Sequence, residues 1–205
     1  MIRYFVYNGN SGLRNHPNRD YYSSAALPRH LQSIDIWHTF KIQLPQPNAF
    51  YPPAQTRIQC TPPTAQQGGI YSTVLIDMDQ ELLVSDIRRY RVGEIRFVFT
   101  LSESQDRNGC ERFNLGPLFA YVHWFSPISK PSVSSRFRTV KKEVYRDIPD
   151  GGIVPLSNIV VPCPLAPVLP GRLQKGSIRS ATCMETELEF YINPFASHID
   201  YELYA

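Results

Sequence analysis

The sequence predicts an all-β fold, a small and strongly bent β-barrel with proline-rich loops and few short helices. The 205 residues include eighteen prolines, eleven glycines and twelve tyrosines, a composition that suits short strands joined by rigid turns. Several segments alternate apolar and polar side chains with the two-residue period of a half-buried strand. Gly93 lies just inside the longest of these segments, and the pair Trp124-Phe125 ends the next one. Both features fit a sheet that bends sharply.

Length and composition indicate one globular unit. A chain of 205 residues is long enough for one substantial core and short for two. With 42% hydrophobic and 19% charged residues, the chain is expected to be ordered over most of its length. The formal net charge of +3 permits contact with nucleic acid without requiring it. No apolar run reaches the length of a signal peptide or a membrane span, so we expect an intracellular protein with no membrane contact.

Residues 1–69 are predicted to be an extension that packs one long strand on the core. Residues 34–44 alternate over eleven positions, with Trp37 on the less apolar face. His38 falls on the apolar face, as a core histidine would, and Pro45 ends the strand because proline cannot donate to a ladder. The proline-rich stretch 45–69 is expected to be loop, with a short strand at 56–60.

Residues 70–170 are predicted to form the β core. The β-branched run 71–76 comes first, and then 90–101 and 118–125 predict a long hairpin of two aromatic and β-branched strands. A strand at 137–145 and a turn at 147–152 follow. Residues 153–156 and 159–161, read as two short strands or as a strand and a turn, complete this core. In the C-terminal extension, 171–205, the segment 185–192 reads as a final helical turn or a strand.

Two halves of the core resemble a bromo-adjacent homology (BAH) domain. Val92-Gly93-Glu94-Ile95, then Tyr121 to Phe125 with Pro127, resembles the opening of that domain. The second half is similar in Glu143-Val144-Tyr145 and in Val154 to Ile159 with Cys163 and Leu165. The order agrees over 70–170. The resemblance implies a BAH/SH3-like core and a non-enzymatic nuclear module that binds a histone tail, a nucleosome or another chromatin protein.

A second resemblance covers most of the chain. Residues 37–44, 91–99, 118–127, 153–167 and 190–195 are similar to the C-terminal region of basidiomycete transposon proteins of the Plavaka and Kyakuja-Dileera-Zisupton type. It implies a nuclear, fungal, transposon-related accessory domain, without the nuclease centre that lies elsewhere in such proteins.

Some BAH domains enclose methyl-lysine in an aromatic cage, in which a cation lies over ring faces. Ser126 stands where the resemblance would place one cage aromatic, so the cage is incomplete here. Tyr121 and Trp124 have opposite strand parity, so at most one of them faces a common groove. Core packing is the better reading for Phe97, Phe99 and Phe125. The ligand-binding candidates are Trp37, Tyr90, Tyr121 and Trp124, and for all but Tyr121 burial and binding remain equally open.

Basic residues interleaved with aromatic rings offer an alternative, because phosphates and exposed bases are bound by such a mixture. A solvated strand edge would show the same pattern, since Lys and Arg discourage aggregation there. If these residues bind phosphates and bases, the chain contacts DNA directly. The nucleic-acid-binding candidates are Arg88, Arg89, Arg91, Arg136, Arg138, Lys141 and Lys142.

No residue set predicts catalysis, a metal or a cofactor. Asp77 and Asp79 follow a strand as metal-binding carboxylates do, yet strand-end aspartates more often bond their own backbone in a turn. Motifs for nucleotide, zinc-protease or serine-hydrolase sites are missing. The four cysteines lack paired zinc-site spacing and are expected to be reduced thiols; they are Cys60, Cys110, Cys163 and Cys183.

Overall fold

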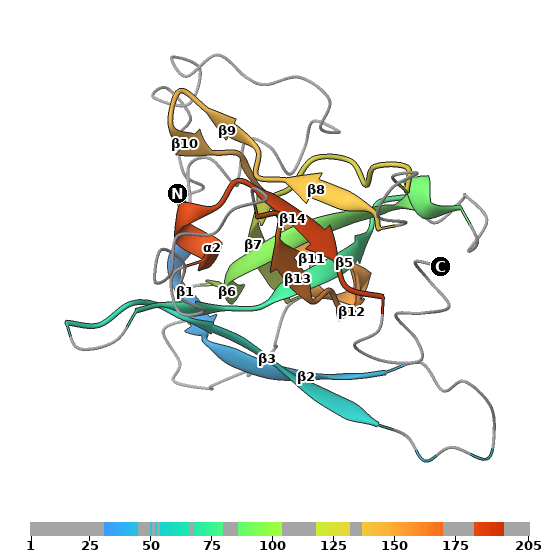
Figure 1. Ribbon diagram of the computed structural model, residues 1–205. Helices are drawn as coiled ribbons and strands as arrows, with labels where there is room; N and C mark the ends of the chain where they lie inside the picture. Colours follow the sequence, from blue (N-terminus) through green and yellow to red (C-terminus); the bar gives the residue numbers. More distant parts are fainter. Residues whose placement is uncertain are drawn as a thin grey trace, which may run out of the picture.

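The computed structural model confirms the all-β prediction and corrects the barrel. It describes residues 31–44, 50, 52, 54–65, 68–79, 86–103, 118–131, 137–169 and 183–194. Within these ranges most residues lie in strands, with one α-helical turn, α2 (Cys183–Thr186), and two 3₁₀ turns, η2 (Ile87–Arg89) and η3 (Leu156–Asn158). The described strands form separate open sheets that do not close on themselves (Figure 1). The all-β prediction is therefore confirmed, and the small bent barrel is corrected to a set of open sheets.

The central sheet is built around one long strand, β6 (Tyr90–Glu103). One edge of β6 pairs first with β5 (Thr73–Asp77) and then with β1 (Leu31–Trp37), and the other edge pairs with β7 (Phe119–Trp124). The order continues to β11 (Gly151–Pro155) beyond β7 and to β12 (Ile159–Pro162) beyond β5. The β6–β7 pair confirms the predicted hairpin strands.

Two smaller sheets cover opposite faces of the central sheet. One contains β2 (Thr39–Gln43), β3 (Gln55–Thr61) and β4 (Ile70–Tyr71), and the other contains β13 (Leu165–Pro167), β14 (Glu189–Ile192) and β8 (Thr139–Lys141) (Figure 1). Strand alternation sends Val74 and Ile76 into the first core, while Leu75 enters the second. The first core adds Ile58, Cys60, Ile95, Val122 and Trp124; the second adds Val92, Phe125, Val140, Phe190 and Ile192.

The predicted long strand at 34–44 is divided at His38. The segment before His38 pairs with the central sheet, and the segment after it pairs with β3. The His38 carbonyl accepts a hydrogen bond from the Cys60 amide at 2.8 Å, and its ring nitrogen Nδ1 lies 3.1 Å from the Cys60 oxygen. His38 is exposed at this corner, which corrects the core-histidine prediction. The chain passes from one sheet to the next at His38, so one alternating segment of sequence contributes strands to two sheets.

The region 137–155 also differs from the prediction. The single strand expected at 137–145 is divided into β8 and β9 (Val144–Tyr145), and β9 forms a hairpin with β10 (Ile148–Pro149). Gly151 and Gly152, predicted to lie in a turn, are part of β11. A Cβ at Gly152 would lie 2.6 Å from Nε1 of Trp124. The glycine is therefore needed for a close approach of the indole to the strand.

Candidate functional site

The four aromatic ligand candidates do not meet in one cage. Trp124 is 7% exposed in the first core, and Tyr90 is buried in the second core, on the opposite face of the central sheet. Trp37 is half-buried against the first core. Tyr121 is half-buried and stacks on Phe97, with ring centroids 5.3 Å apart. Of the two readings left open for Tyr90 and Trp124, burial is therefore the one that the structure shows. The separation of Tyr121 from Trp124 agrees with their opposite strand parity.

Two glycines and an arginine lie close to the Trp124 ring. A Cβ at Gly93 would lie 3.5 Å from Cζ3 of the indole, and Gly152 approaches the other end of the ring. The Arg91 guanidinium carbon lies 4.6 Å from the ring centroid, a cation–π contact. Gly93 and Trp124, both noted in the sequence, therefore pack against each other.

Arg91 joins the central sheet to the β9–β10 hairpin. Its Nε donates to the Phe125 carbonyl at 2.9 Å, and its Nη2 donates to the Glu143 carboxylate. The Asp150 carboxylate lies 3.9 Å from the same Nη2. Because these carboxylates flank the hairpin, the guanidinium is committed to the protein and is not free for a phosphate.

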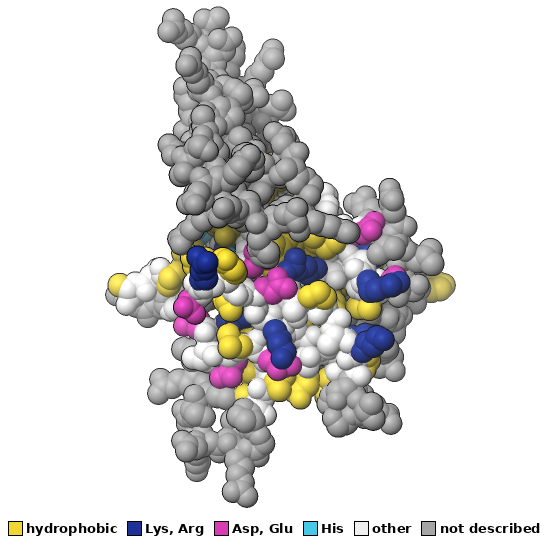
Figure 2. Space-filling view, turned by 90° about the horizontal axis from the view of Figure 1, so that it is seen from above, with side chains coloured by type: hydrophobic (Ala, Val, Ile, Leu, Met, Phe, Trp, Pro, Cys, Tyr) yellow, Lys and Arg dark blue, Asp and Glu magenta, His cyan; other side chains and the backbone are white. Residues whose placement is uncertain are grey.

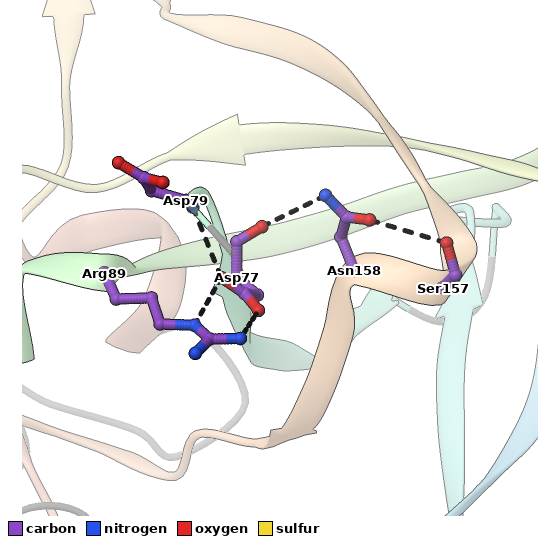
Figure 3. Close-up of polar contacts among 5 residues, drawn as sticks. All are labelled: Asp77, Asp79, Arg89, Ser157 and Asn158. Atoms are coloured by element: carbon purple, nitrogen blue, oxygen red, sulfur yellow. Dashed lines mark hydrogen bonds and ion pairs between the residues drawn. The ribbon is translucent and has the colours of Figure 1, made fainter. Parts of the chain in front are cut away.

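Asp77 is held in a polar network at the end of β5 (Figure 3). Arg89 donates to both carboxylate oxygens, at 2.8 Å from Nε and 2.5 Å from Nη2. These hydrogen bonds hold the pKa of Asp77 below its usual value, although its burial opposes the shift. The Asp79 amide donates to Asp77 Oδ1 at 3.2 Å, and Asn158 Nδ2 donates to the Asp77 carbonyl at 3.0 Å. This is the turn role expected for Asp77 rather than a metal site.

The other basic candidates also have partners. Arg88 pairs with Asp86 at 2.6 Å, and Arg138 Nη1 donates to the Ser129 carbonyl at 3.3 Å. Lys141 pairs with Glu189 at 3.3 Å. Lys142 lies 5.7 Å from the Phe190 ring centroid, and partial burial lowers its pKa. Arg136 lies outside the described residues.

The surface seen from above mixes both signs of charge. In Figure 2, Lys and Arg side chains are interspersed with Asp and Glu, with apolar side chains between them. A nucleic-acid interface normally requires a patch or stripe of one positive sign. This face has no such patch among the side chains that the structure describes.

A buried carboxylate that is not among the predicted site residues lies on the face of β6 and β7 that carries the second core. Glu94 is 7% exposed, pairs with Arg96 at 3.2 Å and lies 3.9 Å from Nδ1 of His123. Burial raises the pKa of Glu94 and lowers the pKa of His123 to about 4, the latter with help from the charges of Arg96 and Lys142. The β6–β7 register, which pairs Glu94 with His123, is the signal that could have found this cluster.

The three described cysteines are withdrawn from solvent to different degrees. Cys60 and Cys163 are buried and Cys183 is half-buried, while Cys110 lies outside the described residues. Burial raises the pKa of Cys60 to about 11, which keeps the thiol protonated. Among the described residues no group of His, Cys, Asp and Glu could hold a metal ion.

The β9–β10 hairpin exposes apolar side chains instead of covering them. Val144 is 51% exposed, Tyr145 is 60% exposed and Ile148 is 48% exposed. The two turn residues, Arg146 and Asp147, have φ angles of 51° and 64°. This hairpin was not predicted from the sequence, because residues 137–145 read as one strand.

Comparison with known proteins gives no relative. No protein-family model, no curated protein and no solved structure matches the chain. Within the described residues, no helix is long and apolar enough to cross a membrane.

Proposed function

We propose that this chain is a non-enzymatic, BAH-like binding module of the nucleus that recognises a histone tail or a chromatin protein. The observation that carries the proposal is an exposed apolar hairpin on a buried framework. Of the fragments that resemble a BAH domain, those around Gly93 and Trp124 are packed inside. The fragment Glu143-Val144-Tyr145 instead presents apolar side chains to solvent. Exposed apolar clusters of this kind mark interaction sites.

Hydrogen bonds between the buried fragments that resemble a BAH domain support the same proposal. Glu143 donates its amide to the Trp124 carbonyl at 3.1 Å and binds Arg91 through its side chain. Asn158 bonds the end of β5 from η3. Trp124, Glu143 and Asn158 belong to different fragments that resemble a BAH domain. Their hydrogen bonds stabilise one scaffold although the fragments are distant in sequence. A scaffold that fixes an exposed element is the usual basis of a binding module.

A second candidate function is a DNA-binding accessory domain of a mobile-element protein. The observation that favours it is exposure: the Arg88 side chain is 82% exposed and the Lys141 side chain is 64% exposed. Exposed ion pairs are weak, so a phosphate could replace Asp86 or Glu189 as partner. The mixed charge in Figure 2 makes this the second choice.

Two measurements on the purified chain test these functions together. A modified-histone-peptide array, accompanied by titration of purified histone complexes, is expected to give selective binding. A duplex-DNA titration at several salt concentrations is expected to give weak binding with a shallow slope. A steep fall of DNA affinity with salt, without binding to any histone probe, would reverse the order of the two candidates.

A further inference from the structure

We propose that the β9–β10 hairpin is a docking arm whose apolar tip enters an apolar cleft with a basic rim on a folded partner protein. The docking arm comprises residues 143–150. This inference rests on the proposed binding function and adds to it the place of contact and the chemistry of the partner.

Both faces of the docking arm are apolar. Ile148 lies opposite Tyr145 in the ladder, and Pro149 lies opposite Val144, so each pair shares one face. All four side chains are exposed. A surface strand normally turns polar residues to solvent on at least one face. An arm that is apolar on both faces fits insertion between two walls of a cleft better than contact with a flat surface.

The base of the docking arm is fixed to the central sheet. The Asp150 amide donates to the Glu143 carbonyl at 2.8 Å, and the Trp124 amide donates to the Asp150 carbonyl at 2.8 Å. Arg91 adds its bond to the Glu143 side chain. An element held in this way loses little conformational freedom on binding, which favours affinity.

The turn of the docking arm is strained. Arg146 and Asp147 both have left-handed φ angles, as a two-residue type I′ turn requires, although glycine or asparagine is the usual occupant. Non-glycine residues in this region cost free energy and cluster at sites of function. Arg146 also covers the Tyr145 ring, 5.2 Å from its centroid. The two-residue turn keeps the arm short, with Tyr145 and Ile148 opposite each other next to it.

The edge of the arm argues against binding by strand addition. Because Asp150 donates to Glu143, the next pair, Val144 and Pro149, directs its backbone groups outward. Pro149 has no N–H, so the β10 edge cannot donate to an added strand at that position. Along the β10 edge, side chains must then supply most of the contact, which favours a shaped cleft over an extended peptide.

Charge selects the kind of partner. The arm carries three carboxylates, Glu143, Asp147 and Asp150, against the single cation Arg146. Arg91 binds Glu143 and lies 3.9 Å from Asp150, so the arm together with this arginine has a formal charge of −1 (two positive minus three negative). The arm therefore offers no excess positive charge to nucleic acid or anionic lipid, and a cleft rimmed by Lys or Arg is its complement.

The test compares the full chain with two variants by calorimetric titration. The probes are the purified tetramer and the purified dimer of core histones, histone-tail peptides and duplex DNA. Tyr145→Ser/Ile148→Ser removes the apolar tip, and Met78→Ser, at a residue 47% exposed beyond β5, is the matched control. All three proteins are expected to melt at the same temperature. The tip variant should bind a folded histone complex at least tenfold more weakly, and the control should bind like the wild type.

The outcomes separate the inference from the proposed function. If the tip variant binds a histone complex as tightly as the wild type does, or only tail peptides bind and the tip variant binds them normally, the docking arm is refuted and the binding function stands. If no histone probe binds the wild type, both fall. Asp147→Lys is expected to weaken binding by several-fold, and unchanged or tighter binding would refute the basic rim. Loss of DNA affinity alone in the tip variant would also overturn the inference.

Discussion

The indole of Trp124 fills space that two glycines leave open, and Arg91 closes the ring face. Replacing Trp124 with Ala should therefore leave a cavity in the first core, and we expect the free energy of unfolding to fall by about 3–5 kcal/mol. Urea denaturation measures the change. Tyr145→Ala, at an exposed ring, is the control and should stay within about 0.5 kcal/mol of the wild type. A Trp124 variant as stable as this control would contradict the buried assignment.

His123 gives the fold a pH dependence of its own. Its pKa is about 6.5 when unfolded and about 4 in the folded chain, because burial and nearby cations disfavour the charged ring. The unfolded state therefore takes up the proton first, and the stability that His123 contributes is complete above pH 6.5 and is lost as the pH falls to 4. We expect a loss on the order of 2–3 kcal/mol over that range.

His123→Gln isolates this effect. Glu94, whose pKa is raised, acts with the opposite sign, and its contribution is lost as the pH rises. Subtracting the stability of the variant from that of the wild type, by denaturation at each pH, largely cancels the contribution of Glu94. The difference should shrink between pH 6.5 and 4. A difference that stays constant over this range would show that His123 titrates normally.

The sequence predicted side-chain direction better than burial. Alternation placed Tyr121 and Trp124 on opposite faces, and the structure agrees. Alternation could not predict that Trp124 is buried. Part of the layer that packs on it comes from β3, which is more than sixty residues away along the chain. Glu94 was missed for a similar reason. Its meaning depends on His123 in the neighbouring strand, and a strand register is not visible in one segment alone.

Among the elements, long alternating segments were predicted well and strand ends poorly. β6, β7 and β3 appear where the pattern placed them, because each segment belongs to a single sheet. Residues 34–44 alternate through a change of sheet, and residues 137–145 read as one strand through another, so neither segment shows its break. Gly151 and Gly152 read as a turn because glycine is common in turns, whereas here glycine makes room for two aromatic rings.

The turn of the docking arm offers a prediction for this element. Asp147 has a left-handed φ of 64°, which an L side chain adopts at a cost and glycine adopts freely. Asp147→Gly should therefore stabilise the folded chain by about 0.5–1 kcal/mol, which raises the melting temperature by roughly 1–4 °C. Calorimetry measures the shift. Asp79→Gly, a change of the same chemistry in another turn, should not raise it, and a lower melting temperature for Asp147→Gly would exclude strain at this position.

On the scale of the whole molecule, strand content could be predicted and layering could not. Short strands and a glycine-bent hairpin suggested closure into a barrel. The chain instead places a three-stranded sheet on each face of the central sheet. The segment 183–194, expected to belong to an extension, supplies β14 in the middle of one covering sheet. Such order depends on contacts between distant strands, to which local periodicity gives no guide.

The distribution of charge over the whole molecule carries the last prediction. Arg88, Arg89 and Arg91 would bind phosphates if the basic strand were a DNA interface, and each lost contact should reduce the dependence of affinity on log salt by roughly 0.9. In the structure each of the three pairs with a carboxylate: Asp86, Asp77 and Glu143 respectively.

Changing all three arginines to Gln should therefore leave the salt slope of any residual duplex binding unchanged. The same change should lower stability, because Asp77 and Glu143 lose their buried or half-buried partners. Arg88→Gln alone, at the exposed pair, controls for charge without this loss. Filter binding at several salt concentrations gives the slope, and denaturation gives the stability. A slope flatter by about 0.9 for each arginine, with stability unchanged, would make these side chains phosphate ligands and favour the DNA-binding candidate.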